Sequence, residues 1–184
     1  LQTVGLGYAT AQSSSFVRHL ADGGNVRSQL HDVGRTSLWM KTRFIVGDPA
    51  ASSNLRLRMK YDDGFVAYLN GIRVAAANAP EPQPPAWNDV AAAVNADAAA
   101  VIFKEFPLGA SAQLVTGENV LAIHGLNTAL GASSDALWVP ELLADTALPI
   151  GTQPVYFTTP TPGLANGIGS TTVPPLVLEL TENP

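Results

Sequence analysis

The chain has 184 residues, a net charge of −5, no cysteine and 46% hydrophobic residues, and only 14% of its residues are charged. These values predict one folded domain with a hydrophobic core, and they exclude a disordered tail, a disulfide framework and a cysteine-rich zinc site. Ten basic residues against fifteen acidic ones argue against a nucleic-acid partner, and no apolar run approaches the roughly 18 residues of a membrane span.

The first part of the chain, residues 1–36, shows no regular periodicity, and we expect an irregular N-terminal segment that packs on the rest of the domain. Residues 38–46 then alternate between two sets of side chains with period 2, which predicts a half-buried strand. Residues 55–61 alternate apolar side chains with three cations. A strand places such cations on one solvated face, whereas a helix scatters them.

Two turn sequences follow this second strand. Asp62-Asp63-Gly64 leads into the apolar run 65–69, and Asn70-Gly71 leads into 72–75. Asn-Gly is the strongest two-residue hairpin signal, because both positions tolerate the positive φ of a type I′ turn. The pattern predicts a three-stranded antiparallel meander over residues 55–75.

The middle of the chain begins with a Pro-rich loop at 79–85 that leads to Trp87. The Ala-rich stretch 88–101 predicts one short surface helix with Asn88 as its N-cap. The later strands are expected at 102–106, at 120–126 as a central strand buried on both faces, and at 136–143.

Many short strands, one short helix and no alternating βαβ pattern predict an all-β fold, an antiparallel β-sandwich of the jelly-roll type. We expect its core to span residues 37–148. Residues 149–175 are rich in Pro, Thr and Gly and predict a strap or linker, and 176–184 predict the start of a following domain or a tail. Because the sequence opens on Leu1, we interpret it as a segment of a longer protein.

Two motifs carry a family resemblance. L-R-L-R-M-K-Y-D-D-G-F-V-A-Y-L-N-G-I-R-V-A at 55–75 and T-G-E-N-V-L-A-I-H-G-L-N at 116–127 together resemble the galactose-binding-like jelly roll. The pair is similar to the sugar-binding domain of family 2 glycoside hydrolases and, more closely, to modules repeated in large secreted planctomycete-type bacterial proteins. Y-F-T-T-P-T-P-G at 156–163 is similar to the strap that follows such modules.

The turn at Asp62-Asp63-Gly64 carries a second resemblance, to the lectin domain of the protective-antigen type, in whose sugar-binding members an aspartate pair holds Ca²⁺. Here Asn70-Gly71 stands where that family usually has Asp-Gly. The residues themselves leave two alternatives open. Asp62 and Asp63 are either calcium ligands, since Ca²⁺ takes hard oxygen ligands, or part of a polar turn in which an aspartate accepts hydrogen bonds from backbone N–H groups.

No catalytic pattern is present in the sequence. The histidines are His19, His31 and His124, and none has metal-ligand spacing to another or a nucleophile elbow beside it. His124 lies inside an apolar strand, where we expect a buried histidine with a hydrogen-bond partner. No two carboxylates form the pattern of a glycosidase. We therefore expect no enzymatic activity.

Exposed aromatic side chains are the strongest candidates for a binding site, because sugar rings stack on flat aromatic rings through their C–H faces. The candidates are Trp39, Trp87, Trp138 and Tyr68. Trp87 follows the Pro-rich run and is predicted to be the main platform, with Asn88 and Asp89 as hydroxyl partners and Tyr68 as a second platform. The alternative for Trp87 is a loop anchor inserted at the edge of the sandwich. Trp138 alternates within a strand, which favours core packing.

The sequence thus predicts a non-catalytic carbohydrate-binding accessory module of a multidomain secreted protein. Its expected partners are a plant or microbial cell-wall polysaccharide and the neighbouring domains of the parent chain, with no nucleic acid and no membrane. Its expected location is extracellular or at the cell surface, and its expected state is monomeric. The alternative is a structural or adhesion spacer module that binds no sugar.

Overall fold

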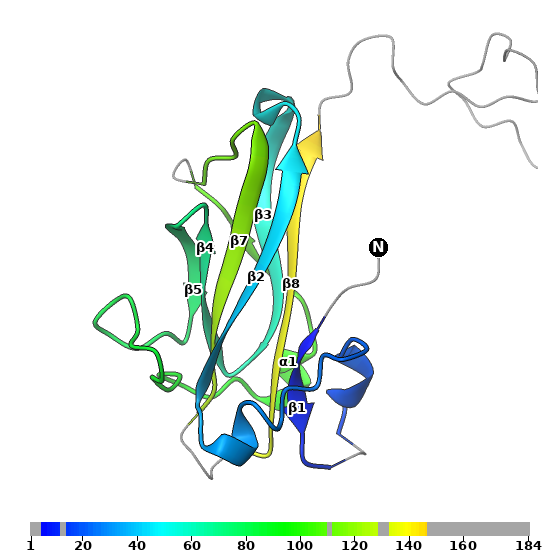
Figure 1. The fold of residues 1–184 in the computed structure, drawn as a ribbon, viewed down its shortest axis with the longest axis vertical. Coiled ribbons are helices and arrows are strands. Elements are labelled where there is room, and N and C mark those ends of the chain that lie inside the picture. The colour runs from blue at the N-terminus through cyan, green and yellow to red at the C-terminus, as the bar shows by residue number, and fades with distance from the viewer. Residues whose placement is uncertain (1–4, 12–13, 110–111, 129–132, 147–184) are drawn as a thin grey trace, which may run out of the picture. The chain divides into compact units, whose positions relative to one another are not determined.

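The computed structural model describes residues 5–11, 14–109, 112–128 and 133–146. Within these residues, eight strands form two four-stranded antiparallel sheets that face each other, with one short α-helix at one end (Figure 1). This is the predicted all-β sandwich. No helix in this part of the chain is both long and apolar enough to span a membrane. The predicted strap at 149–175 and the predicted segment at 176–184 lie outside the described residues.

The strands are β1 (Leu6–Ala9), β2 (Ser37–Val46), β3 (Ser52–Asp62), β4 (Gly64–Leu69), β5 (Ile72–Ala77), β6 (Lys104–Pro107), β7 (Gly117–Leu126) and β8 (Asp135–Thr146). The helices are α1 (Asp97–Ala100) and the 3₁₀ turns η1 (Val17–His19), η2 (His31–Val33) and η3 (Pro49–Ala51).

The strand order is β1-β8-β3-β6 in one sheet, here called sheet A, and β2-β7-β4-β5 in the other, called sheet B. The chain changes sheet at every connection except the β4–β5 hairpin (Figure 1). Two four-stranded sheets joined by such crossings form a jelly roll, which confirms the fold predicted from the turn and strand pattern.

The predicted three-stranded meander over 55–75 is wrong in one connection. β4 and β5 form the expected hairpin, but β3 belongs to sheet A. Asp62, the last residue of β3, pairs with β8, whereas Gly64, the first of β4, pairs with β7. Asp63 alone links the two strands, so this sequence forms a corner between sheets. A corner and a hairpin turn both favour Asp and Gly, and the local pattern does not separate them.

The predicted helix over 88–101 is also wrong in its extent. Only Asp97–Ala100 is α-helical, and the residue before it is Ala96, so Asn88 is not an N-cap. The backbone N–H of Ala91 donates to the Asn127 carbonyl at 2.8 Å instead. Hydrogen bonds from this segment to the sandwich replace the i→i−4 bonds that a longer helix needs.

The N-terminal segment is more regular than the sequence predicts, because β1 pairs with β8 and forms an edge of sheet A. Gly7 lies in β1, where an added Cβ would come within 2.1 Å of the Ala136 carbonyl oxygen, so only glycine permits this approach. Phe16 from the same segment is fully buried beside Leu137. β1 has only four residues and one of them is glycine, which is more typical of turns than of strands. The sequence pattern therefore did not predict this strand.

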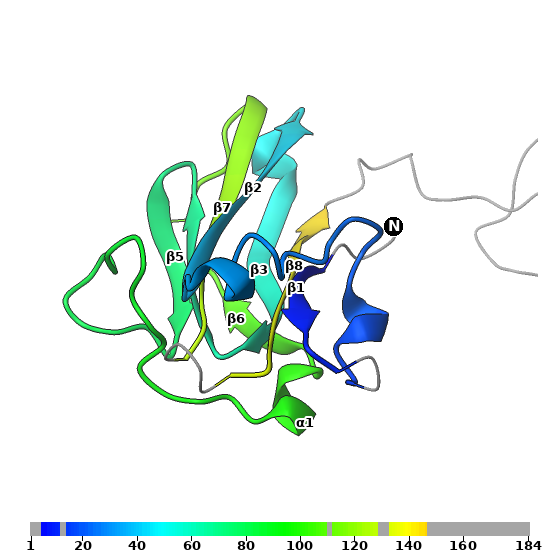
Figure 2. The same ribbon diagram turned by 60° about the horizontal axis from the view of Figure 1, so that its bottom comes forward.

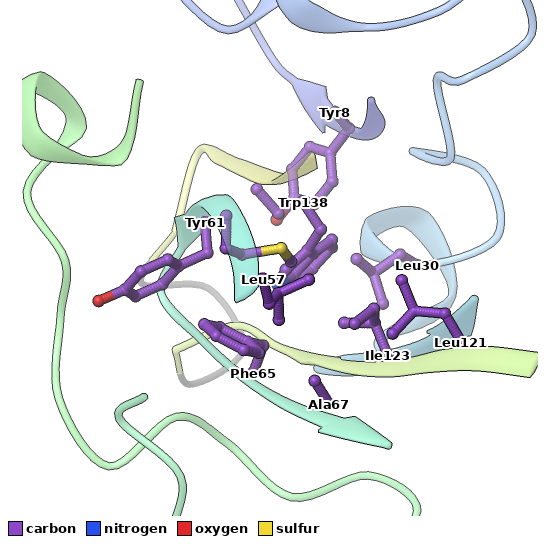
Figure 3. Close-up of a cluster of buried hydrophobic side chains, with 11 residues drawn as sticks. Tyr8, Leu30, Leu57, Tyr61, Phe65, Ala67, Leu121, Ile123 and Trp138 are labelled. Atoms are coloured by element: carbon purple, nitrogen blue, oxygen red, sulfur yellow. The ribbon is translucent and has the colours of Figure 1, made fainter. Parts of the chain in front are cut away.

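The core lies between the two sheets, and Trp138 of β8 is at its centre (Figure 3). The Trp138 side chain is fully buried, and its Nε1–H donates to the Gly64 carbonyl at 2.9 Å. Phe65 and Tyr61 meet edge to face at 5.1 Å in the same cluster. The core position predicted for Trp138 is confirmed, and its indole joins the β3–β4 corner to sheet A.

Candidate functional site

The outward face of sheet B carries aromatic side chains that the core does not use. On β2, Leu38 and Met40 pack against the core, so Trp39 between them points outward. Trp39 pairs with His124 of β7, which pairs with Val66 of β4. Residues directly opposite one another in antiparallel strands share a face, and Tyr68 follows Val66 by two residues, so Tyr68 points outward as well.

Trp39, Tyr68 and His124 form one ring cluster. The Trp39 indole stacks on the His124 imidazole with 4.4 Å between centroids and 10° between planes, and it meets the Tyr68 ring at 5.5 Å and 34°. His124 is fully buried, whereas Trp39 remains 49% exposed. The indole therefore rests on a buried support and presents a fixed, half-exposed aromatic surface to solvent.

The support beneath Trp39 is a hydrogen-bonded chain. The Ser37 hydroxyl donates to the Trp87 carbonyl oxygen, and His124 Nε2 lies 3.0 Å from the same hydroxyl oxygen. The Ser37 hydroxyl hydrogen is already donated to the Trp87 carbonyl, so the Ser37 oxygen can only accept a hydrogen bond from His124. Nε2 of His124 therefore carries the imidazole hydrogen and donates it to Ser37. Burial lowers the pKa of His124, so the ring is neutral at pH 7. His124 Nδ1 has no partner among the described residues.

Trp87 lies on the loop that runs from β5 to α1 across one end of the sandwich (Figure 2). Its side chain is 71% exposed, which contradicts the alternative of a loop anchor inserted into the sandwich edge. Its carbonyl is held by Ser37, which precedes Trp39 by two residues on the same face of β2. Two residues of a strand span about 7 Å, so Trp87 is attached beside Trp39.

Asn88 and Asp89 hold this loop in place. Asn88 Oδ1 accepts a hydrogen bond from the Thr36 backbone N–H at 2.9 Å, and Asp89 Oδ2 accepts one from the Ala86 N–H at 2.6 Å. The Thr36 hydroxyl donates to the Asn88 carbonyl at 2.7 Å. These oxygens fix the position of Trp87, and their contact with sugar hydroxyls stays a prediction.

Tyr68 lies on β4, between β7 and β5, on the outward side of sheet B. Its ring is half-buried, and its hydroxyl has no hydrogen-bond partner in the described part of the chain. Burial raises the pKa of the Tyr68 hydroxyl, while the nearby Arg73 opposes that rise. We name the set Trp39, Tyr68 and Trp87 the aromatic face. The aromatic face contains the two predicted platforms, Trp87 and Tyr68. It also contains Trp39, a candidate to which the sequence analysis assigned no role.

The predicted metal ligands Asp62 and Asp63 lie at the β3–β4 corner, away from solvent. Their exposed fractions are 3% and 2%. Asp63 Oδ1 accepts a hydrogen bond from the Asn95 N–H at 3.0 Å, and Oδ2 accepts one from the Thr128 N–H at 2.9 Å. The Asp63 carboxylate thus bonds backbone N–H groups, as the polar-turn alternative predicts. Within the described ranges, no three His, Asp or Glu side chains are grouped to hold a metal ion.

The Asp62 carboxyl carries a proton at pH 7. Burial, followed by the negative charge of Asp63, raises the pKa of Asp62 to about 9, and Asp135 and Asp97 add to the rise. Burial also raises the pKa of Asp135, with Asp97 contributing. A buried carboxyl among other acids becomes neutral unless a cation compensates it.

Calcium at Asp62 and Asp63 stays a prediction, and chelation tests it. A cation that binds only the folded state raises the melting temperature by mass action. If Ca²⁺ is bound, EDTA should lower the melting temperature by several degrees, added Ca²⁺ should restore it, and Asp62→Asn should remove the response. A melting curve unchanged by chelator would leave Asp63 as a residue that caps backbone N–H groups.

Comparison with known proteins adds little to this geometry. No protein-family model matches the chain, and no curated protein matches it. Among solved structures, the chain is similar to native alfa-L-rhamnosidase from Aspergillus terreus, with 12% sequence identity and a TM-score of 0.41. The match covers 63% of this chain and 13% of that one, so the chain spans about an eighth of the enzyme. The class of the protein therefore follows from its own topology and surface: a jelly-roll domain with an exposed aromatic face.

Proposed function

We propose that this domain is a non-catalytic carbohydrate-binding module of a multidomain secreted protein, and that sugars bind at the aromatic face. The observation that carries the proposal is Trp39, whose half-exposed indole is held on the buried His124 ring. A rigid ring fixed before binding loses little conformational entropy when a pyranose stacks on it. A spacer domain needs no such surface.

The composition of the face supports binding over catalysis. The face presents the exposed rings of Trp39 and Trp87, and the imidazole beneath it, His124, is buried and neutral. General acid–base catalysis needs a titratable group within reach of substrate. The shallow surface also sets the expected affinity. A Kd of about 1 mM corresponds to roughly 4 kcal/mol, which one or two stacked rings and a few hydroxyl contacts supply.

Removing the exposed rings tests the proposal. Trp39→Ala and Trp87→Ala should each abolish retardation of the domain in gels that contain a polysaccharide it binds, because each removes a stacking platform. The melting temperature should change by only a few degrees, since Trp87 is 71% exposed and Trp39 is 49% exposed and outside the core. The panel is cellulose, xylan, mannan, pectin and chitin.

Ile45→Ala is the matched control. Ile45 lies on the same outward side of β2 and is 75% exposed, but six residues from Trp39. This variant should bind as the unaltered domain does. If the unaltered domain is retarded by none of the polymers, the spacer alternative replaces the proposal.

A further inference from the structure

Two Lys or Arg side chains beside the aromatic face differ from the other cations of the protein in their contacts. All ten Lys and Arg side chains lie in the described residues. Eight of them have a hydrogen bond, an ion pair or a ring contact, namely Arg18, Arg27, Arg35, Arg43, Arg56, Arg58, Lys60 and Lys104. Lys41 and Arg73 have none to any described residue.

These two unpaired cations lie in one cross-strand row of sheet B. Lys41 of β2 pairs with Ala122 of β7, which pairs with Tyr68 of β4, which pairs with Arg73 of β5. Opposed residues share a face, so both cations point outward with Tyr68, and both are exposed. The adjacent row carries Trp39.

Only the methyl group of Ala122 lies between Lys41 and Tyr68 in this row, and Arg73 is the direct neighbour of Tyr68 on the other side. Each cation therefore borders the Tyr68 ring with no bulky side chain in between. Three strand spacings of about 4.8 Å put roughly 14 Å between Lys41 and Arg73. This is the separation of the two backbones, and a ligand that engages both cations with the Tyr68 ring between them spans several sugar units.

The surrounding charges leave the row positive. Glu118, on the outward side of β7, is paired with Arg43 at 3.7 Å. The chain as a whole has a net charge of −5. The Asp89 carboxylate acts on the His124 ring, but it lies on the Trp87 loop outside this row and accepts a hydrogen bond from the Ala86 N–H. At physiological ionic strength the screening length is about 8 Å, so a ligand that lies along the row is influenced most by Lys41 and Arg73.

We infer that the aromatic face binds an anionic polysaccharide with carboxylated sugar units, whose rings stack on Trp39 and Tyr68 while its carboxylates pair with Lys41 and Arg73. The inference rests on the proposed function and specifies its ligand. The planar guanidinium of Arg73 matches the two oxygens of a carboxylate, which favours uronate units.

Pectin offers a matched pair of probes, because its de-esterified and methyl-esterified forms share one backbone and differ in charge. In calcium-free buffer, calorimetric titration should show at least tenfold tighter binding to the de-esterified polymer or to alginate than to the esterified form. High salt should weaken it. Arg73→Gln and Lys41→Gln should each weaken binding several-fold, and the double variant should lose the preference.

Arg43→Gln, which removes an ion-paired cation from the same face of β2, is the control and should retain the preference. Equal binding to both pectin forms that still depends on Trp39 would overturn this inference and keep the proposed function. Binding to dextran sulfate with none to the uronates would overturn the carboxylate assignment. Binding to no polymer, neutral or charged, would overturn both.

Discussion

Replacing Asp62 with asparagine is expected to stabilise the domain by about 4 kcal/mol at pH 7. The Asp62 carboxyl is buried, and its pKa is about 9 in the folded chain. In the unfolded chain its pKa returns to about 3.9. At pH 7 the unfolded state therefore gains from ionising Asp62, whereas the folded state does not. Asparagine has a similar shape and cannot ionise, so it removes that gain.

The same difference makes the unaltered domain sensitive to alkali. Between the two pKa values of Asp62, the unfolded chain has released the proton and the folded chain retains it, so rising pH favours unfolding. From pH 7 to pH 9 the loss should be about 2 kcal/mol, or about 4–8 °C in melting temperature. Between pH 7 and pH 9, His19 and His124 add little to this change in stability. Their lowered pKa values keep both neutral in the folded state above pH 7.

Urea denaturation of both proteins at pH 7 and pH 9 in EDTA measures these effects. Asp22→Asn is the control, since Asp22 is exposed and the substitution likewise replaces a carboxyl group with an amide. It should behave as the unaltered domain. If Asp62→Asn and Asp22→Asn show the same stability and the same pH dependence, Asp62 does not hold a proton in the folded state.

The strands were largely predictable because each carries a local signal, either period-2 alternation or a short apolar run. The expected segments at 38–46, 65–69 and 136–143 lie within β2, β4 and β8. Their pairing across sheets was less predictable. The three residues at the β3–β4 corner look like a hairpin, and what makes them a corner is distant: β8 pairs with Asp62, and the Trp138 indole binds the Gly64 carbonyl.

In the candidate site, too, the individual residues were predictable and their contacts were not. Trp87 and Tyr68 were predicted from residue type, and Trp39 had a signal as well, because it shares a strand phase with Lys41 and Arg43 and so belongs to the solvated side of its strand. The stacking of Trp39 on His124 was not predictable. It depends on the register between β2 and β7, which the sequence pattern does not give.

The second large effect is expected at Gly125 of β7, which faces Trp138 across the core. A Cβ added at Gly125 would come within 2.5 Å of Trp138 Cε2 and 2.7 Å of Cδ2. The indole has little room to move, because it is fully buried and bonded through Nε1 to the Gly64 carbonyl. Gly125→Ala should therefore destabilise the domain by about 3 kcal/mol, the upper part of the range for overpacked cores.

A double-mutant cycle identifies the clash as the cause. Trp138→Ala alone should cost about 3–5 kcal/mol through cavity formation, but it also leaves space for a methyl group at 125. The double variant should be more stable than the sum of the two losses predicts, by about 1–3 kcal/mol. Gly47→Ala is the control, since an added Cβ there meets no atom within 4 Å. If urea denaturation gives Gly125→Ala the same stability as Gly47→Ala, the Trp138 ring does not lie against β7.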